Sequence, residues 1–184
     1  KATGLKYTWK NVPKPPSAKC LVRISQGTRR SDDTNALTLS GHSEEVHSVA
    51  FNPDGSSVAT GSYDGTAKIW DAVTGALLRN LTGHKSSITS VAFSLDGSRI
   101  VTGSGDKTAK IWDANTGAFL RNLSGHISPV NSVAFSSDGS RVATGSSDGT
   151  AKIWDTNTGA LIRTLTGHAN AVECISFSPD RITI

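Results

Sequence analysis

The chain has 184 residues, of which 36% are hydrophobic and 18% charged, a composition that is ordinary for a folded protein and excludes a disordered one. No apolar run approaches the roughly 18 residues of a membrane span, and the first residues lack the apolar stretch of a secretory signal. We therefore expect a soluble protein, cytoplasmic or nuclear, that has no membrane contact.

The first 35 residues form a basic segment. Eight lysine and arginine residues precede the first acidic residue, Asp32, and the rest of the chain has more acids than bases. These bases are spread along a proline-containing stretch with only Tyr7 and Trp9 nearby, whereas nucleic-acid sites gather bases on a folded face or interleave them with stacking aromatics. We expect residues 1–35 to be a solvated arm or linker with a candidate strand at 17–22. Binding of nucleic acid or an anionic surface by this arm is the alternative.

The two cysteines, Cys20 and Cys174, cannot build a disulfide framework. The chain has no Cys-x-x-Cys pair and no Cys/His spacing that is typical of a metal site. We therefore expect reduced thiols, no metal and no cofactor.

A unit of 42 residues is repeated after the arm. The dipeptide Gly-His occurs at 41–42, 83–84, 125–126 and 167–168. The octapeptide DGTAKIWD occurs at 64–71 and 148–155, with DKTAKIWD midway at 106–113. Such self-similarity predicts a repeat architecture. The full repeats are 41–82, 83–124 and 125–166, and a partial repeat covers 167–184.

Each repeat is divided into short segments by turn residues. In the second repeat, the segments ITSVAF, RIVTGS, AKIWD and AFLRNL are separated by SLDGS, GDKT and ANTG. Alternating or β-branched segments of this length, bounded by Gly, Asp and Asn, predict four strands joined by tight turns. A single four-stranded unit cannot bury both faces, so the units must stack on one another, and radial stacking gives a propeller.

The repeats resemble those of the WD-repeat propeller family, because each full repeat opens with Gly-His and closes its third strand with Trp-Asp. The resemblance covers residues 36–184. It implies an all-β fold, a β-propeller built of four-stranded antiparallel blades, with three full repeats plus one split or incomplete blade.

The resemblance also implies a buried hydrogen-bonded tetrad of His, Thr, Asp and Trp in each full repeat. An indole N–H only donates, a carboxylate only accepts, and a hydroxyl and a neutral imidazole do both, so the chain from Trp through Thr and His to Asp closes without an unpaired group. The expected tetrads are His42, Thr60, Asp64 and Trp70; His84, Thr102, Asp106 and Trp112; and His126, Thr144, Asp148 and Trp154.

Two chemical interpretations compete with this structural one. Thr, His and Asp together resemble a nucleophile, a base and its orienting group, and four histidines in register suggest a ring of metal ligands. The same set recurs three times at identical spacing, which fits a structural role better than a single active site, and histidines from separate blades would lie far apart. We therefore expect no enzymatic activity.

The partial repeat leaves the ends of the array open to several arrangements. Residues 172–177 match the first strand of the other repeats, ALTL before Gly41 matches a fourth strand, and SAKCLV at 17–22 resembles a third strand with Leu21 in place of Trp. The two termini could thus share one blade. Three arrangements remain: a fragment of a longer propeller, pairing of chains as a homo-oligomer that completes a larger ring, or a closed four-bladed monomer.

Function is expected where the repeats differ. The residues after each Gly-His and before each turn Asp vary, and in the family these positions lie on the upper rim, where partners dock. We expect a protein-protein interaction scaffold that binds a protein or peptide there. The candidate rim residues are Ser43, Glu44, Glu45, His47, Tyr63, Lys85, Ser87, Thr89, Gly105, Ile127, Pro129, Asn131, Ser147, Asn170 and Glu173.

Overall fold

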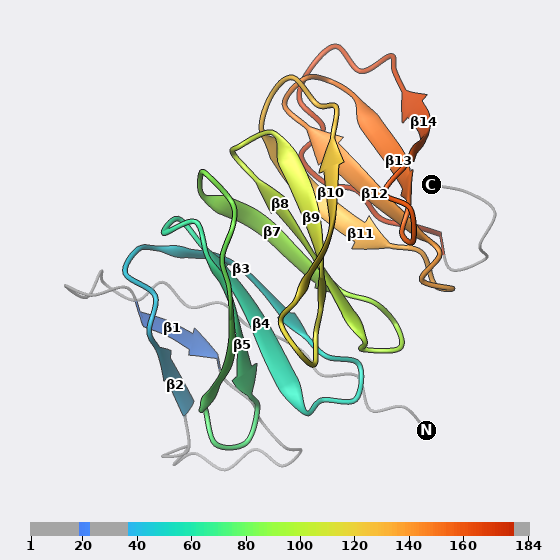
Figure 1. Cartoon of the computed structure of the whole chain (residues 1–184). Helices are drawn as coiled ribbons and strands as arrows, with labels where there is room; N and C mark the ends of the chain where they lie inside the picture. Colours follow the sequence, from blue (N-terminus) through green and yellow to red (C-terminus); the bar gives the residue numbers. More distant parts are fainter. Residues whose placement is uncertain (1–18, 23–36, 179–184) are drawn as a thin grey trace.

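The computed structural model describes residues 19–22 and 37–178 of the chain, and all regular elements among them are strands. They form three four-stranded antiparallel sheets and one two-stranded sheet, stacked side by side along the chain (Figure 1). The predicted all-β fold of propeller blades, three of them full and one incomplete, is confirmed. None of the described residues belongs to a helix that could cross a lipid bilayer.

Each full blade uses four consecutive strands in sequence order. The incomplete blade holds β1 (Lys19–Val22) and β2 (Leu37–Ser40). The first blade holds β3 (Val46–Phe51), β4 (Ser57–Ser62), β5 (Ala67–Asp71) and β6 (Leu77–Leu81). The second holds β7 (Ile88–Phe93), β8 (Arg99–Ser104), β9 (Thr108–Asp113) and β10 (Phe119–Ser124). The third holds β11 (Val130–Phe135), β12 (Arg141–Ser146), β13 (Ala151–Asp155) and β14 (Leu161–Leu165).

The loops lie at two ends of the blades. We call the end with the Gly-His loop and the turn between the second and third strands the upper end, and the other end the lower end. The upper turn needs a residue in the left-handed region, which Gly65 and Gly149 supply with φ of +78° and +77°. In the second blade Lys107 takes this position with φ of +71°. A side chain there carries a steric cost that glycine avoids.

A glycine in the second strand of each blade sets how closely the next blade approaches. A Cβ atom built on Gly61 would lie 2.6 Å from Cγ2 of Ile88 and 2.8 Å from Cγ1 of Val91, both on the first strand of the following blade. Gly103 faces Val130 and Val133 in the same way. The invariant Thr-Gly-Ser segment thus lets consecutive blades pack at close range.

Polar contacts link the blades at their inner and outer edges. At the inner strands, the hydroxyl of Ser48 accepts a hydrogen bond from the Val91 N–H at 3.0 Å, and Ser90 accepts one from the Val133 N–H at 3.2 Å. At the outer strand, Nε of Arg79 donates to the carbonyl oxygen of Asn115 in the next blade at 2.7 Å. Because these contacts repeat with the sequence period, they fix one angle between neighbouring blades.

The outer part of each blade interface is a leucine packed with the tryptophan of the next blade. Leu39 is in one cluster with Trp70, Leu81 with Trp112, and Leu123 with Trp154. Leu81 and Leu123 are each 1% exposed, whereas Leu165, the equivalent residue of the third blade, is only half-buried. The outer edge of the third blade is therefore less covered than the same edge of the first two.

The described residues do not form the shared blade that was one of the arrangements left open for the two termini. Strands β1 and β2 pair with each other beside the first blade, whereas residues 171–178 lie without regular structure against the third blade, at the opposite end of the array (Figure 1). The Val172 N–H donates to Ser146 O and the Ile175 N–H to the Ser132 hydroxyl, so this segment follows the course of a first strand. Three blades stacked at one repeated angle do not bring the ends together.

Candidate functional site

The tetrad of the first blade forms one continuous chain of hydrogen bonds. The indole N–H of Trp70, on β5, donates to Oγ1 of Thr60, on β4, at 2.8 Å. The same hydroxyl lies 2.8 Å from Nε2 of His42, and Nδ1 of His42 lies 2.8 Å from Oδ2 of Asp64. The four side chains thus connect the Gly-His loop, two strands and the upper turn.

The second and third blades repeat this geometry. The Trp-to-Thr bond is 2.9 Å in both, and each His-to-Asp bond is 2.8 Å. The His-to-Thr distance is 2.8 Å in the second blade and 2.7 Å in the third. All three predicted sets of residues are therefore brought together by the fold.

The donor-only indole dictates the direction of each chain. Because Trp70 donates to the Thr60 hydroxyl, that hydroxyl is free to donate its own proton to Nε2 of His42, which leaves Nδ1–H of the neutral ring to donate to Asp64. Burial lowers the pKa of His42, and this effect outweighs the opposing attraction of the Asp64 carboxylate. The pKa values of His84 and His126 are lowered by the same cause.

The carboxylate at the end of each chain stays ionised. Burial alone would raise the pKa of Asp64, but hydrogen bonds from the Thr66 hydroxyl, from His42 and from the Thr66 and Ser43 N–H groups lower it to about 2. Asp106 has the same arrangement and a pKa of about 2. The pKa of Asp148 is also lowered, against the effect of its burial, by hydrogen bonds led by that from the Thr150 hydroxyl.

The geometry of the tetrads fits a structural lock. The Thr60 hydroxyl, which a nucleophilic mechanism would need to expose, belongs to a residue that is 0% exposed, and Thr102 and Thr144 are equally buried. The hydroxyl oxygen already has two hydrogen-bond partners, the indole N–H on one side and the imidazole ring on the other. A substrate therefore has no approach to this oxygen without disrupting the blade. The described residues also hold no group of three His, Cys, Asp or Glu side chains that is arranged for a metal ion.

The predicted rim residues lie at the upper end of the blades. In the first blade the Tyr63 N–H donates to Glu45 O, and in the second the Gly105 N–H donates to Ser87 O, each at 2.9 Å. The third blade repeats this bond between Ser147 and Pro129. The variable residues of the Gly-His loop and those of the upper turn thus meet in each full blade.

The rim residues differ in how available they are to a partner. Thr89 is half-buried and its hydroxyl donates to Gly103 O, and the amide of Asn131 is held by Val172 O and the Ser147 hydroxyl. Ser87 and Gly105 are also half-buried. The rim residues that the structure leaves exposed are Ser43, Glu44, Glu45, His47, Tyr63, Lys85, Ile127, Pro129, Ser147, Asn170 and Glu173.

The first blade has the most distinctive rim. The rings of His47 and Tyr63 are in contact, with centroids 3.8 Å apart and planes tilted by 37°. Tyr63 is 46% exposed, and Glu44 lies in the adjoining loop. The second blade has Thr89 and Gly105 at these two positions, so the aromatic pair belongs to the first blade alone among the three full blades.

The family model described as WD domain, G-beta repeat, matches residues 34–71, 75–113, 117–155 and 159–184. The chain belongs to the WD-repeat family. Each of the first three matched units holds the last strand of one sheet and the first three strands of the next, so the matched units are offset from the blades by one strand.

Three curated relatives match this chain over about one repeat each. The chain is 58% identical to Protein Mut11 of Chlamydomonas reinhardtii over 38 residues, which is 21% of this chain and 10% of the relative. It is 44% identical to THO complex subunit 6 of Arabidopsis thaliana over 43 residues, 23% of this chain and 12% of the relative. It is 43% identical to Target of rapamycin complex subunit wat1 of Schizosaccharomyces pombe over 44 residues, 24% of this chain and 14% of the relative. The matched part is thus a small share of each relative's length.

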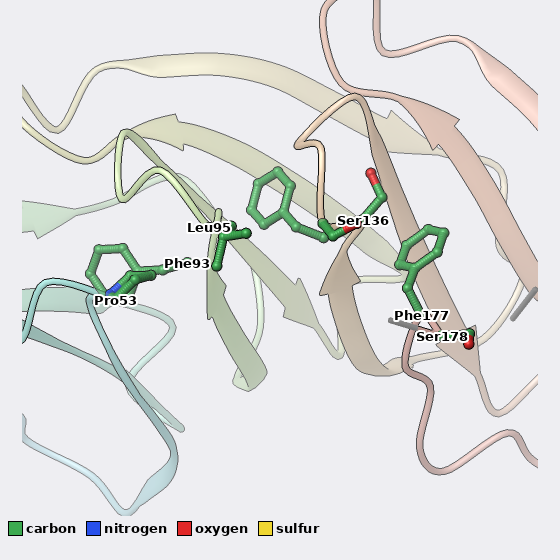
Figure 2. Close-up of a pocket in the computed structure, with 8 residues that line it drawn as sticks. Pro53, Phe93, Leu95, Ser136, Phe177 and Ser178 are labelled. Atoms are coloured by element: carbon green, nitrogen blue, oxygen red, sulfur yellow. The ribbon is translucent and has the colours of Figure 1, made fainter. Parts of the chain in front are cut away.

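Sequence reasoning missed a second feature, at the lower end. Phe93, Phe135 and Phe177 border a hollow there, together with Leu95 (Figure 2). These phenylalanines recur with the 42-residue period, so the sequence signal was present. Each of these phenylalanines ends a Ser-Val-Ala-Phe-like strand, and a strand end in the interior would carry the same residue type, so the repeat alone does not distinguish the two environments.

Acidification is expected to destabilise the WD-repeat blades in two steps. The buried histidines have pKa values below their ordinary 6.5, so the unfolded chain binds more protons as the pH falls through that value, and stability is lost. Asp64 and Asp106, with pKa values of about 2 against 3.8 in the unfolded chain, add a second loss below about pH 4.

The urea midpoint of unfolding, followed by tryptophan fluorescence in a series of buffers from about pH 8 to about pH 3, measures both steps. We expect it to fall between about pH 7 and about pH 5 and to fall again below about pH 4. A midpoint that is flat or rises between about pH 7 and about pH 5 contradicts the neutral state of the buried rings.

Proposed function

We propose that this chain is a non-enzymatic interaction scaffold that holds a protein or peptide partner on the upper rim of its blades. The proposal rests on one observation, namely that the repeats differ in their exposed upper loops and not in their tetrads. The tetrads are identical in all three full blades, whereas the exposed loops above them differ in charge, size and aromatic content. A surface that varies on a constant framework is typical of a binding site on a rigid scaffold.

The aromatic pair of the first blade is the best candidate for the centre of this surface. His47 and Tyr63 are exposed and already stacked, so a partner would gain contact area without having to order either ring. Tyrosine is enriched at energetically important interface positions for this reason. Two of the matched relatives are named as subunits of complexes, which agrees with a binding role for WD repeats.

This proposal is tested by capturing binding partners from a native extract on three forms of the chain. Mass spectrometry then compares the partners that each form retains. The rim form carries His47→Ala with Tyr63→Ser, the matched control carries Val73→Ser on a lower turn, where Val73 is 82% exposed, and the third is unchanged. We expect a partner that is retained by the unchanged chain and the control and lost, by about tenfold or more, by the rim form.

The alternative is tested on the same proteins. Binding of a fluorescent DNA duplex with a steep dependence on salt, equal in all three forms, would instead favour nucleic-acid binding through the basic arm. Equal capture of every partner by the rim form and the unchanged chain contradicts the rim proposal.

We also propose that a further blade, supplied by a second copy of the chain, covers the outer edge of the third blade. The half-buried Leu165 supports this, because its equivalents Leu81 and Leu123 are fully covered by the next blade. A blade in a repeat array buries its faces only against neighbouring blades, so an uncovered apolar position favours association with a further blade.

Light scattering coupled to size exclusion tests this pairing. We expect a mass near twice the chain's 19.2 kDa, reduced to that of one chain by Leu165→Asp and unaffected by Leu78→Asp, since Leu78 is 42% exposed on the outer strand of the first blade. A single-chain mass for the unchanged protein contradicts pairing.

A further inference from the structure

The rim of the second blade differs from the other two rims by being basic. Its Gly-His loop carries Lys85 and its upper turn carries Lys107, and both side chains are exposed and form no ion pair among the described residues. The equivalent residues are Ser43 and Gly65 in the first blade and Ile127 and Gly149 in the third. Bases in these two segments are therefore a property of the second blade alone among the three full blades.

The upper turn of the second blade has exchanged the positions of its glycine and its side chain. Gly105 stands where the first blade has Tyr63 and the third has Ser147, although the φ of Gly105 is not positive. Lys107 stands where the other blades have glycine, with φ of +71°. The backbone of the turn accounts for neither residue, because the position that favours glycine carries lysine and the position that carries glycine does not need it.

The missing side chain at Gly105 leaves room for two serine hydroxyls. A Cβ atom built on Gly105 would lie 2.9 Å from Oγ of Ser86 and 3.2 Å from Oγ of Ser87. Neither hydroxyl forms a hydrogen bond within the part of the chain that the structure describes, whereas the carbonyl oxygens of both residues accept bonds, from the Ser104 hydroxyl and the Gly105 N–H. Two unpaired hydroxyls on a fixed backbone thus converge on Gly105.

The carboxylate of this rim, Asp106, already has its own donors. Its oxygens accept hydrogen bonds from the His84 ring, the Lys85 N–H, and the N–H and hydroxyl of Thr108. The side-chain groups that remain without a partner around the turn are two hydroxyls and two ammonium groups. An anion with several acceptor oxygens is the ligand that such a set of donors fits.

The serine loop also adjoins the aromatic pair of the first blade. A Cβ atom built on Gly65, in the upper turn that carries Tyr63, would lie 3.3 Å from the carbonyl oxygen of Ser86. Ser86 thus touches the upper turn of the first blade with its carbonyl group and that of the second blade with its hydroxyl. A partner that lies on His47 and Tyr63 therefore reaches this loop without leaving the rim.

We propose that the rim of the second blade binds a phosphate monoester on the protein partner, that is, a phosphorylated serine or threonine side chain. The hydroxyls of Ser86 and Ser87 donate to its oxygens, and Lys85 and Lys107 balance its charge through their flexible stems. A phosphate monoester has three acceptor oxygens and a charge of about −1.5 to −2 at pH 7, so it engages more of these donors than a carboxylate does. The proposal rests on the upper-rim function and specifies the chemistry of its partner.

A titration of the isotopically labelled full chain with capped phosphoserine, followed by amide chemical shifts, tests this site directly. We expect saturable shifts at Ser86, Ser87, Gly105 and Lys107, and none with capped serine. Capped glutamate should bind at least about fivefold more weakly, because it offers fewer acceptor oxygens and less charge. Absence of saturable shifts at these amides, or equal binding of glutamate and phosphoserine, overturns the proposal.

The sharpest variant is Lys107→Gly, which installs the residue that the first and third blades have at this position. It should raise the Kd for phosphoserine at least about fivefold and leave the urea midpoint unchanged or higher, since glycine suits the positive φ. Arg163→Gln is the matched control, because it removes one exposed positive charge from the outer strand of the third blade, and it should leave the Kd unchanged. Equal effects of the two variants would indicate a general effect of charge and contradict the site.

Phosphatase treatment of the native extract separates this proposal from the upper-rim function. We expect the captured partner to be lost from the treated extract and from Lys107→Gly. A partner that survives both changes but is lost with His47→Ala and Tyr63→Ser leaves the rim function standing and overturns the phosphate site. If no partner depends on the rim, the rim function fails, and the phosphoserine titration still decides whether the site binds phosphate.

Nucleic acid is the competing source of phosphate, and the same amides report on it. A single-stranded oligonucleotide that shifts them at a lower phosphate concentration than phosphoserine does would assign the site to nucleic acid and overturn the proposal. We expect the opposite order, because a phosphodiester has fewer free oxygens and less charge than a monoester.

Discussion

The buried threonine hydroxyl on the second strand of each blade is the interaction on which the rest of the structure depends. It takes the indole N–H from the third strand and bonds the imidazole from the Gly-His loop, so three separate segments meet at one oxygen. The indole that it orients also packs in the cluster with the leucine of the preceding blade. Hydrogen bonding within a blade and packing between blades therefore share one side chain, which explains why the sequence around it tolerates so little change.

Because the tetrad side chains serve both the blade and its contact with the next blade, they stay constant, whereas the exposed loops above them vary. Each lock lies below the upper loops and binds them through backbone and carboxylate groups, as when the Ser43 and Lys85 N–H groups donate to Asp64 and Asp106. The side chains at these loop positions point away from the lock and are free to differ. A framework that constrains backbone positions but not side-chain identity suits a binding module, and the chain's membership of the WD-repeat family agrees with that role.

The periodic part of the molecule could be predicted from sequence, and its ends could not. The resemblance to the WD-repeat family, carried along the 42-residue period, named the tetrad residues, and the structure brings each set together because every one of these contacts lies within one repeat. The position of residues 172–177 depended on the sum of angles between blades, a property that no single repeat encodes. The sequence indicated that His47 and Tyr63 are variable rim residues. It did not predict the contact between their rings, because that contact depends on the geometry of the loops that carry them. The hollow lined by Leu95 and the phenylalanines could not be predicted from the sequence. Large apolar side chains occupy both the protein interior and this hollow, so residue type alone does not separate them.

The most direct test of this account is the stability of Thr102→Val, measured by urea unfolding beside Thr82→Val, an exposed position outside the tetrads. Valine matches threonine in shape, so the change removes the hydroxyl and leaves the Trp112 N–H and the His84 ring without their buried partner. We predict a loss of about 2 to 4 kcal/mol for Thr102→Val and less than about 0.5 kcal/mol for Thr82→Val. Equal and small losses for the two variants would contradict the central place given to this hydroxyl.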